Sequence, residues 1–128
     1  MTVLRRFVDA SGGYFPGPLV VGADGALYGP AVGGVSVLNT FPGLVYRFDP
    51  ATGDFKVLHK FNIADGRDPM GPLFQGDDGD LYATTWQGGP SNTGVIYKVN
   101  PAGDFTLLHI LGVNEGWEPN GNLVRAAD

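Results

Sequence analysis

Two histidines occupy equivalent places in the sequence, and histidine is the side chain that most readily exchanges a proton near neutral pH. His59 lies in the run VLHKF and His109 in the run LLHIL. A histidine among apolar residues is commonly a core side chain that donates to a neighbouring carbonyl. The chain has no Gly-x-Ser-x-Gly motif and no Ser-His-Asp spacing that stands out. We therefore expect both histidines to be structural, and the alternative is that one acts as a general base.

Pairs of acids also recur at equivalent places. The run DGRDP supplies Asp65 and Asp68, and the run EGWEP supplies Glu115 and Glu118. Calcium takes about six to eight oxygen ligands, so these four carboxylates are weak candidates for a calcium site. The alternative is that they cap turns and face water. The glycine after the first acid of each run, at positions 66 and 116, predicts a positive φ.

Two tryptophans fall in segments that read as loops. Trp86 is followed by Gln87 and, six residues later, by Asn92, and Trp117 lies between the acids of the second run. An exposed indole ring flanked by amides is suited to stacking on a sugar ring or another flat apolar face. The alternative is that each tryptophan covers the rim of an apolar core. These four residues are the candidate ligand-binding residues.

The segments that must position these residues belong to an internal repeat. Leu19 matches Leu73 at an offset of 54 (73 − 19), and His59 matches His109 at an offset of 50 (109 − 59). Most of the difference falls in residues 34–43 against 89–94, so we expect a loop there. A period near 50 residues with several short apolar runs is typical of a propeller blade.

Each copy contains four short apolar runs separated by turn signals. These are chiefly Asp-Gly in both copies, with Pro-Ala-Thr-Gly in the first copy and Pro-Ala-Gly in the second. The runs predict strands over residues 19–21, 26–29, 44–48 and 55–61 in the first copy, and 73–75, 80–85, 95–99 and 105–111 in the second. The expected fold is all-β, with antiparallel four-stranded repeats that resemble propeller blades. Strict alternation along the fourth strand would place Phe55, Val57, His59 and Phe61 on one face. The longer loops should gather at one end of the blades, which is the candidate functional face.

The ends of the sequence read as parts of further repeats. Residues 1–7 match the last strand of a repeat, residues 19–61 and 73–111 form two full repeats, and residues 122–128 match a first strand. Lone strands would expose unpaired backbone groups, a condition that proteins normally avoid. We therefore expect identical chains to assemble into a closed homo-oligomeric ring. The alternative is that the sequence is a piece of a longer protein.

Composition limits the kinds of partner. The 128 residues carry a net charge of −5, which argues against binding to nucleic acid or to anionic membranes. No run of 18 apolar residues is present, and the first residues lack the apolar core of a signal peptide. The absence of cysteine excludes disulfides and zinc–thiolate sites.

The sequence as a whole resembles the GloVer tandem repeats of bacterial choice-of-anchor tandem-repeat proteins. The resemblance lies in the runs GDLYATT from Gly79, GVIYK from Gly94, GDFTLLH from Gly103 and GWEP from Gly116. The first copy departs from the pattern with Gly29-Pro30-Ala31 in place of a Gly-Thr-Thr-like run. The resemblance implies a repeat fold and a bacterial extracellular or surface location, with a cytoplasmic one otherwise, and it supplies no catalytic residue.

Three functions are compatible with these patterns. The first is a propeller-type repeat module that binds a carbohydrate or a protein on its long-loop face. The second is a calcium-dependent propeller hydrolase that acts on a lactone or an ester, which rests on analogy of fold. The third is a structural repeat that only assembles with further repeats.

Overall fold

The computed structural model describes residues 15–33, 42–112 and 114, and within them the protein is all-β, as predicted. The described strands are β1 (Phe15–Pro16), β2 (Val20–Val21), β3 (Leu27–Val32), β4 (Leu44–Phe48), β5 (Phe55–Lys60), β6 (Phe74–Gln75), β7 (Leu81–Thr84), β8 (Val95–Val99) and β9 (Phe105–Ile110). The predicted lone strands at residues 1–7 and 122–128 lie outside the described residues.

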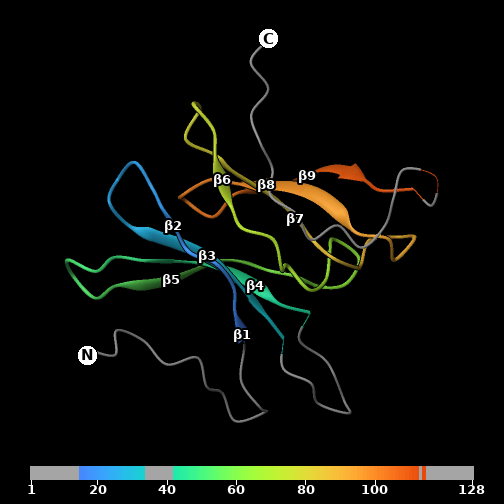
Figure 1. The fold of residues 1–128 in the computed structure, drawn as a ribbon, viewed down its shortest axis with the longest axis horizontal. Helices are drawn as coiled ribbons and strands as arrows, with labels where there is room; N and C mark the ends of the chain where they lie inside the picture. Colours follow the sequence, from blue (N-terminus) through green and yellow to red (C-terminus); the bar gives the residue numbers. More distant parts are fainter. Residues whose placement is uncertain (1–14, 34–41, 113, 115–128) are drawn as a thin grey trace.

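The strands form two antiparallel meanders, one for each copy of the repeat (Figure 1). In the first, β2, β3, β4 and β5 follow one another, and the short β1 pairs with the far half of β3. In the second, the order is β6-β7-β8-β9. We call β1–β5 the first blade and β6–β9 the second blade. The two blades confirm the predicted four-stranded antiparallel repeat; β1 is an addition that the repeat pattern did not predict.

The predicted turn chemistry explains why the meanders form. Gly25 and Gly79, in the Asp-Gly turns before β3 and β7, have φ values of 81° and 85°. Gly53 and Gly103, in the turns before β5 and β9, have φ values of 79° and 101°. Only glycine adopts these angles without strain, so each tight hairpin is encoded locally. The bounds of β4 and β8 agree with those predicted, whereas β3 runs on to Val32.

A β-bulge overturns the predicted alternation in β5. Tyr46 pairs with Val57, but its neighbour Val45 pairs with His59, so Leu58 is the extra residue. As a result Leu58 is buried at 5% exposure, Val57 is 41% exposed, and His59 lies on the opposite face from Phe55. The same irregularity recurs in the second blade, between Ile96 and Tyr97.

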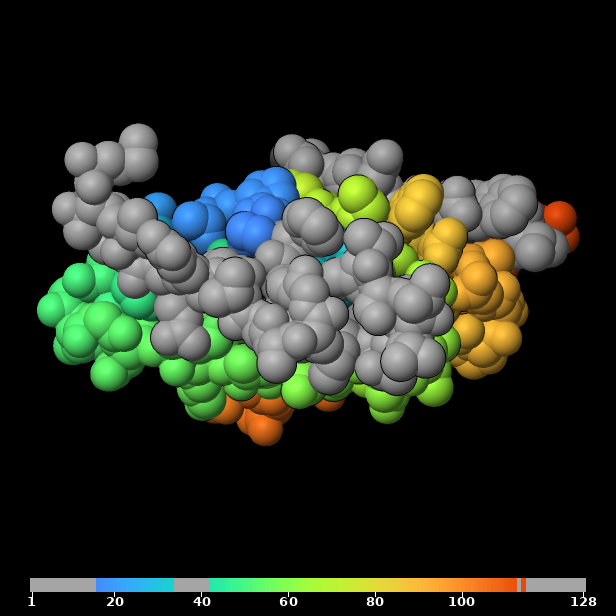
Figure 2. Space-filling model, turned by 90° about the horizontal axis from the view of Figure 1, so that it is seen from below, coloured from blue at the N-terminus to red at the C-terminus, as the bar shows by residue number. Residues whose placement is uncertain are grey.

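The blades pack face to face over one apolar core. Its members come from both sheets, and the largest fully buried ones are Tyr28 and Val45 of the first blade and Leu81, Val95 and Tyr97 of the second. A smaller cluster lies on the other face of the first blade. Figure 2 shows the first blade in blue and green and the second mainly in yellow and orange, in one continuous body. We call the face of the second blade that carries Tyr97 its front, and the face of the first blade that carries Val45 its back. The back of the first blade packs on the front of the second.

Candidate functional site

The connection between the blades pairs with the loop that follows β7. Arg67 and Gln87 exchange two backbone hydrogen bonds of 2.8 and 3.1 Å, and the Trp86 amide donates to the Asp68 carbonyl at 2.9 Å. The Gly89 amide donates to the Ile63 carbonyl at 2.7 Å. We call residues 63–70 and 86–92 the long-loop surface. Two loops distant in sequence thus form one hydrogen-bonded ladder, which holds their side chains in fixed places.

The predicted ligand-binding residues of the second repeat lie on this surface. Trp86 and Gln87 are half-buried on the rung beside Asp68 and Arg67. Asn92 is exposed, but its Oδ1 accepts the Gly88 amide at 3.0 Å and its φ is 54°. The side-chain amide of Asn92 therefore stabilises the loop conformation as well as facing solvent. The fourth candidate, Trp117, lies outside the described residues.

Two large apolar side chains of the surface are exposed. Ile63 is 47% exposed and Met70 is 44% exposed. Ile63 also has a φ of 75°, a rare and strained value for a β-branched residue, and such outliers tend to occur at functional sites. Gly66 has a φ of 140°, which confirms the predicted positive value. Gly116 lies outside the described residues.

The two described acids of the proposed calcium set each face a basic side chain. Asp65 Oδ2 lies 2.9 Å from His59 Nε2, and Asp65 Oδ1 accepts the Asn62 amide at 2.9 Å. Asp68 Oδ2 lies 3.1 Å from Arg67 Nε. Burial raises the pKa of Asp68, and the adjacent Arg67 partly offsets the rise.

A calcium site needs several carboxylates turned toward one point. Within residues 15–33, 42–112 and 114, no group of three or more acids, histidines or cysteines is placed to hold a metal ion. Glu115 and Glu118 lie outside the described residues. The described half of the predicted set therefore gives calcium no support.

His59 is part of the contact between the blades. Its ring stacks on Phe105 of the second blade with centroids 3.7 Å apart, and it meets the edge of Phe61 at 4.9 Å. Phe105 therefore contacts the face of the imidazole ring, and Asp65 contacts its Nε2 atom. His109 occupies the equivalent position of β9 and is exposed. A general base needs a reactive group within reach, and the described surroundings of His59 are aromatic rings and one carboxylate.

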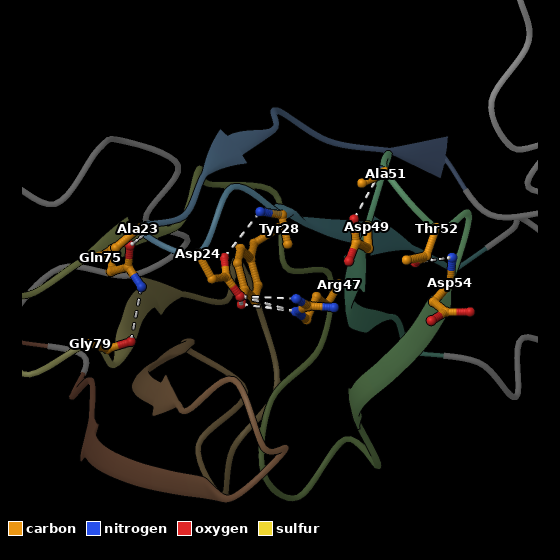
Figure 3. Close-up of polar contacts among 11 residues, drawn as sticks. Ala23, Asp24, Tyr28, Arg47, Asp49, Ala51, Thr52, Asp54, Gln75 and Gly79 are labelled. Carbon is orange, nitrogen blue, oxygen red and sulfur yellow. Dashed lines mark hydrogen bonds and ion pairs between the residues drawn. The ribbon is translucent and has the colours of Figure 1, made fainter.

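One polar cluster was not predicted from the sequence. It is formed by Asp24, Tyr28 and Arg47 at the turn before β3 (Figure 3). Asp24 Oδ2 accepts the Tyr28 hydroxyl at 2.7 Å and pairs with Arg47 Nη2 at 3.0 Å, while Asp24 Oδ1 accepts the Ala26 amide at 3.0 Å. The hydrogen bond from Tyr28 is the main reason why the pKa of Asp24 is lowered, and Ala26 and Arg47 add to it. The cluster ties the turn before β3 to β4.

The second blade repeats this cluster with altered detail. Asp78 Oδ2 accepts the Tyr82 hydroxyl at 2.6 Å, and Lys98 Nζ pairs with Asp80 Oδ2 at 3.1 Å. The signal was present in the sequence as Asp-Gly-x-Leu-Tyr followed, in the third strand, by a tyrosine and a basic residue. Since it recurs wherever the turn recurs, we interpret it as part of the scaffold.

Comparison with models of protein families shows which family the chain belongs to. The model of the Gloeobacter/Verrucomicrobia repeat matches residues 1–128. The chain belongs to this repeat family. The match confirms the resemblance to GloVer repeats and agrees with two copies of one antiparallel blade in the structure.

No curated protein matches the chain at a significant level. In the described residues, no helix is long and apolar enough to cross a membrane. The family assignment thus describes a tandem-repeat module, and any activity has to be argued from its surfaces.

Proposed function

We propose that this repeat module binds a protein partner through the long-loop surface. The observation that carries the proposal is the exposure of Ile63 and Met70, at 47% and 44%, on a surface whose two loops are joined by backbone hydrogen bonds. Rigid loops on a sheet scaffold are where binding residues concentrate. Preorganised side chains lose little conformational entropy on binding, so even a small apolar surface can contribute to affinity.

The charge pattern of the surface adds specificity to this apolar contact. Arg67 and Asp68 form an ion pair with side chains 33% and 14% exposed, beside the half-buried Trp86. Aromatic residues, methionine and arginine are enriched at protein interfaces. A partner segment that offers an apolar side chain to Met70 and an acidic group to Arg67 would match this arrangement.

A sharp test uses peptides selected from a displayed library on the full chain, followed by calorimetric titration. Ile63→Gly removes the exposed side chain and relieves the strained φ, so the variant should stay folded while affinity falls at least tenfold. Met70→Ser should weaken binding in the same direction. Leu108→Ser, a change at a residue of equal exposure on β9, is the control and should bind normally. Peptides that bind both surface variants with the wild-type affinity would contradict the proposal.

A carbohydrate ligand is the second candidate, and Trp86 is the observation that favours it. Its half-buried ring lies on the rung beside the Arg67–Asp68 pair, and Gln87 follows it. Calorimetric titration with a panel of mono- and oligosaccharides tests this possibility. A saturable heat change that Trp86→Phe abolishes would move the proposal from a protein to a sugar.

The calcium-dependent hydrolase stays an alternative without support from the described residues, because Asp65 already contacts His59 and Asp68 already pairs with Arg67. Assays on a panel of lactones and esters, with and without a chelator, address it. Turnover that the chelator abolishes would replace binding by catalysis as the function of the surface.

A further inference from the structure

The ion pair of the long-loop surface joins two residues that are neighbours in the sequence. Arg67 Nε lies 3.1 Å from Asp68 Oδ2, with side chains 33% and 14% exposed. Neighbouring side chains of an extended segment normally point to opposite sides. Asp68 has a φ of 55°, and this left-handed conformation interrupts the alternation, so the two side chains can meet. Asp68 therefore holds the Arg67 side chain at one place on the surface.

The backbone under this ion pair is fixed by loops on both sides. Arg67 pairs with Gln87 in the loop after β7, and the Asp68 carbonyl accepts the Trp86 amide at 2.9 Å. The Asp68 amide donates to the carbonyl of Pro42, in the loop before β4, at 2.8 Å. Because these backbone groups are paired, Asp68 is a rigid support for the arginine.

The contact with Asp68 uses only one edge of the Arg67 guanidinium group. This group carries five N–H donors in a planar fork, and the ion pair involves the donor on Nε. Across residues 15–33, 42–112 and 114, no other hydrogen bond or ion pair involves the Arg67 side chain. Two parallel N–H groups are the pattern with which arginine binds a carboxylate. Arg67 therefore has its Nη groups available for a second carboxylate.

Charge is unevenly distributed over the described part of the chain. The turns before β3, β5, β7 and β9 lie at one end of the blades, because consecutive strands are antiparallel, and the long-loop surface lies at the other end. The turns contain seven acids, against three basic side chains on the adjoining strands, which gives a balance of −4 (3 − 7). The turns are residues 22–26, 49–54, 76–80 and 100–104, and the three bases are Arg47, Lys56 and Lys98.

The long-loop end is neutral by the same count. Its acids are Asp65 and Asp68, and its basic side chains besides His59 are Lys60 and Arg67, a balance of 0 (2 − 2). An acidic partner is repelled by the turns, so the long-loop surface is the end of the described blades that it can approach with the least repulsion.

We propose that the peptide partner of the long-loop surface carries an aspartate or glutamate side chain that Arg67 binds, and that Asp68 is a positioning residue for Arg67. The proposal rests on the proposed function, since it names the chemistry of the partner at the same surface. A supported arginine loses little side-chain entropy on binding, whereas an unsupported arginine has to be ordered first. Asp65 and Asp68 repel a dianionic phosphate more strongly than a carboxylate, so the surface favours a carboxylate.

The test begins with two synthetic libraries of heptapeptides, bound to beads through the C-terminus and acetylated at the N-terminus. One library contains Asp and Glu and the other omits them, and the library with acids should give the tighter binders of the full chain. Each selected peptide is then made in soluble form with its acid and with the matching amide, Asn or Gln. By calorimetric titration the amide form should bind about tenfold more weakly or worse, because it loses a charged hydrogen bond.

Variants of the chain assign this effect to Arg67. Arg67→Gln should weaken binding of the acidic form about tenfold. It should leave binding of the amide form unchanged, which also shows that the variant is folded. Lys56→Gln, which removes one positive charge at the start of β5, is the matched control and should bind both forms like wild type.

Two substitutions at Asp68 separate positioning from charge. Glycine and asparagine both tolerate a φ of 55°, so neither strains the backbone. Asp68→Gly removes the support and should weaken binding of the acidic form about threefold or more, although the loss of a negative charge alone would strengthen it. Asp68→Asn keeps an acceptor for Arg67 Nε and should bind the acidic form more tightly than Asp68→Gly. Neither substitution should change binding of the amide form.

Four outcomes contradict the proposal. Acid-free peptides that bind as tightly as acidic ones, and still lose affinity with Ile63→Gly, would refute the carboxylate and leave the proposed function intact. Acidic peptides that bind Arg67→Gln like wild type would assign the carboxylate to another group. Equal losses of the acidic and amide forms with Asp68→Gly would make Asp68 a structural residue only. A phosphoserine form that binds more tightly than the acidic form would replace the carboxylate by a phosphate.

A failure of the proposed function has a different appearance. It would give no binders from either library, or binders that Ile63→Gly and Met70→Ser leave unaffected. The requirement for an acid would then be wrong together with the surface on which it rests.

Discussion

The imidazole of His59 stacks on the phenyl ring of Phe105 with centroids 3.7 Å apart and planes 8° from parallel. The two residues come from β5 and β9, so the stack joins the outer strands of the two blades. Phe61 meets Phe105 edge-on at 5.8 Å and Tyr97 at 5.2 Å, which extends the contact into the core. An aromatic cluster is therefore part of the packing of one blade on the next.

The stack predicts a coupling between the two residues. In a double-mutant cycle with His59→Leu and Phe105→Leu, we expect a coupling free energy of about 1 kcal/mol. Urea denaturation of the four proteins measures it. His59→Gln should be destabilising too, because it loses the ring contact. Additive effects of the two substitutions would mean that the rings do not interact in solution.

The second prediction concerns Gly66, where both the backbone conformation and the neighbouring atoms disfavour a side chain. Its φ is 140°, and an added Cβ would lie 2.7 Å from Thr85 Cγ2 and 3.0 Å from Phe61. Gly66→Ala should lower the free energy of unfolding by about 1 kcal/mol or more. Gly25→Ala is the control, since its φ of 81° gives the backbone cost with no atom within 4 Å. Equal losses would show that the space around Gly66 is not limiting.

Two buried tyrosines should respond differently to loss of the hydroxyl group. Burial raises the pKa of Tyr97, and in the described part of the chain its hydroxyl is buried with no hydrogen-bond partner. Tyr97→Phe should therefore be neutral or stabilising by up to about 1 kcal/mol. Tyr28→Phe removes the bond to Asp24 and should destabilise by about 1 kcal/mol. Thermal unfolding of both variants separates the cases, and a large loss for Tyr97→Phe would reveal a partner.

The lowered pKa of Asp24 predicts how stability depends on pH. The folded state favours the carboxylate, through the hydrogen bond from Tyr28 first, so its stabilisation is fully present above the unfolded pKa near 3.8. This stabilisation is lost as the pH falls below the unfolded pKa and then through the lower pKa that Asp24 has in the folded state. Asp24→Asn should flatten the acid limb of the stability curve, with Asp54→Asn as a control in the same blade. A curve for Asp24→Asn that falls as steeply as wild type would contradict the assignment.

Much of the fold follows from local patterns. The turn signals and the internal repeat predicted the order of the strands, and β4 and β8 have the bounds expected. The bulge in β5 did not follow, because Val57 and Leu58 are both apolar and nothing local tells which one faces the next blade. The short β1 was missed because it has only two residues and includes Pro16.

The site was harder to predict than the scaffold. Loop lengths predicted that Trp86 and Gln87 lie at the long-loop end of the blade. Their pairing with Arg67 and Asp68 was not predicted, because it depends on backbone contacts between loops about 20 residues apart. Asp65 stays a predicted metal ligand, and its contact with His59 was not predicted from the sequence. Partner choice among polar side chains is set by the tertiary contact, which no single loop encodes.

The packing of blade on blade is tested most directly by two leucines that share one place in the repeat. Leu58 is 5% exposed because the second blade covers it, and Leu108 is 44% exposed. The measurement is the free energy of unfolding of Leu58→Ala and Leu108→Ala by urea denaturation in dilute solution. We predict a loss of about 2 to 4 kcal/mol for Leu58→Ala and less than about 1 kcal/mol for Leu108→Ala. Equal losses would show that the second blade does not pack on the back of the first.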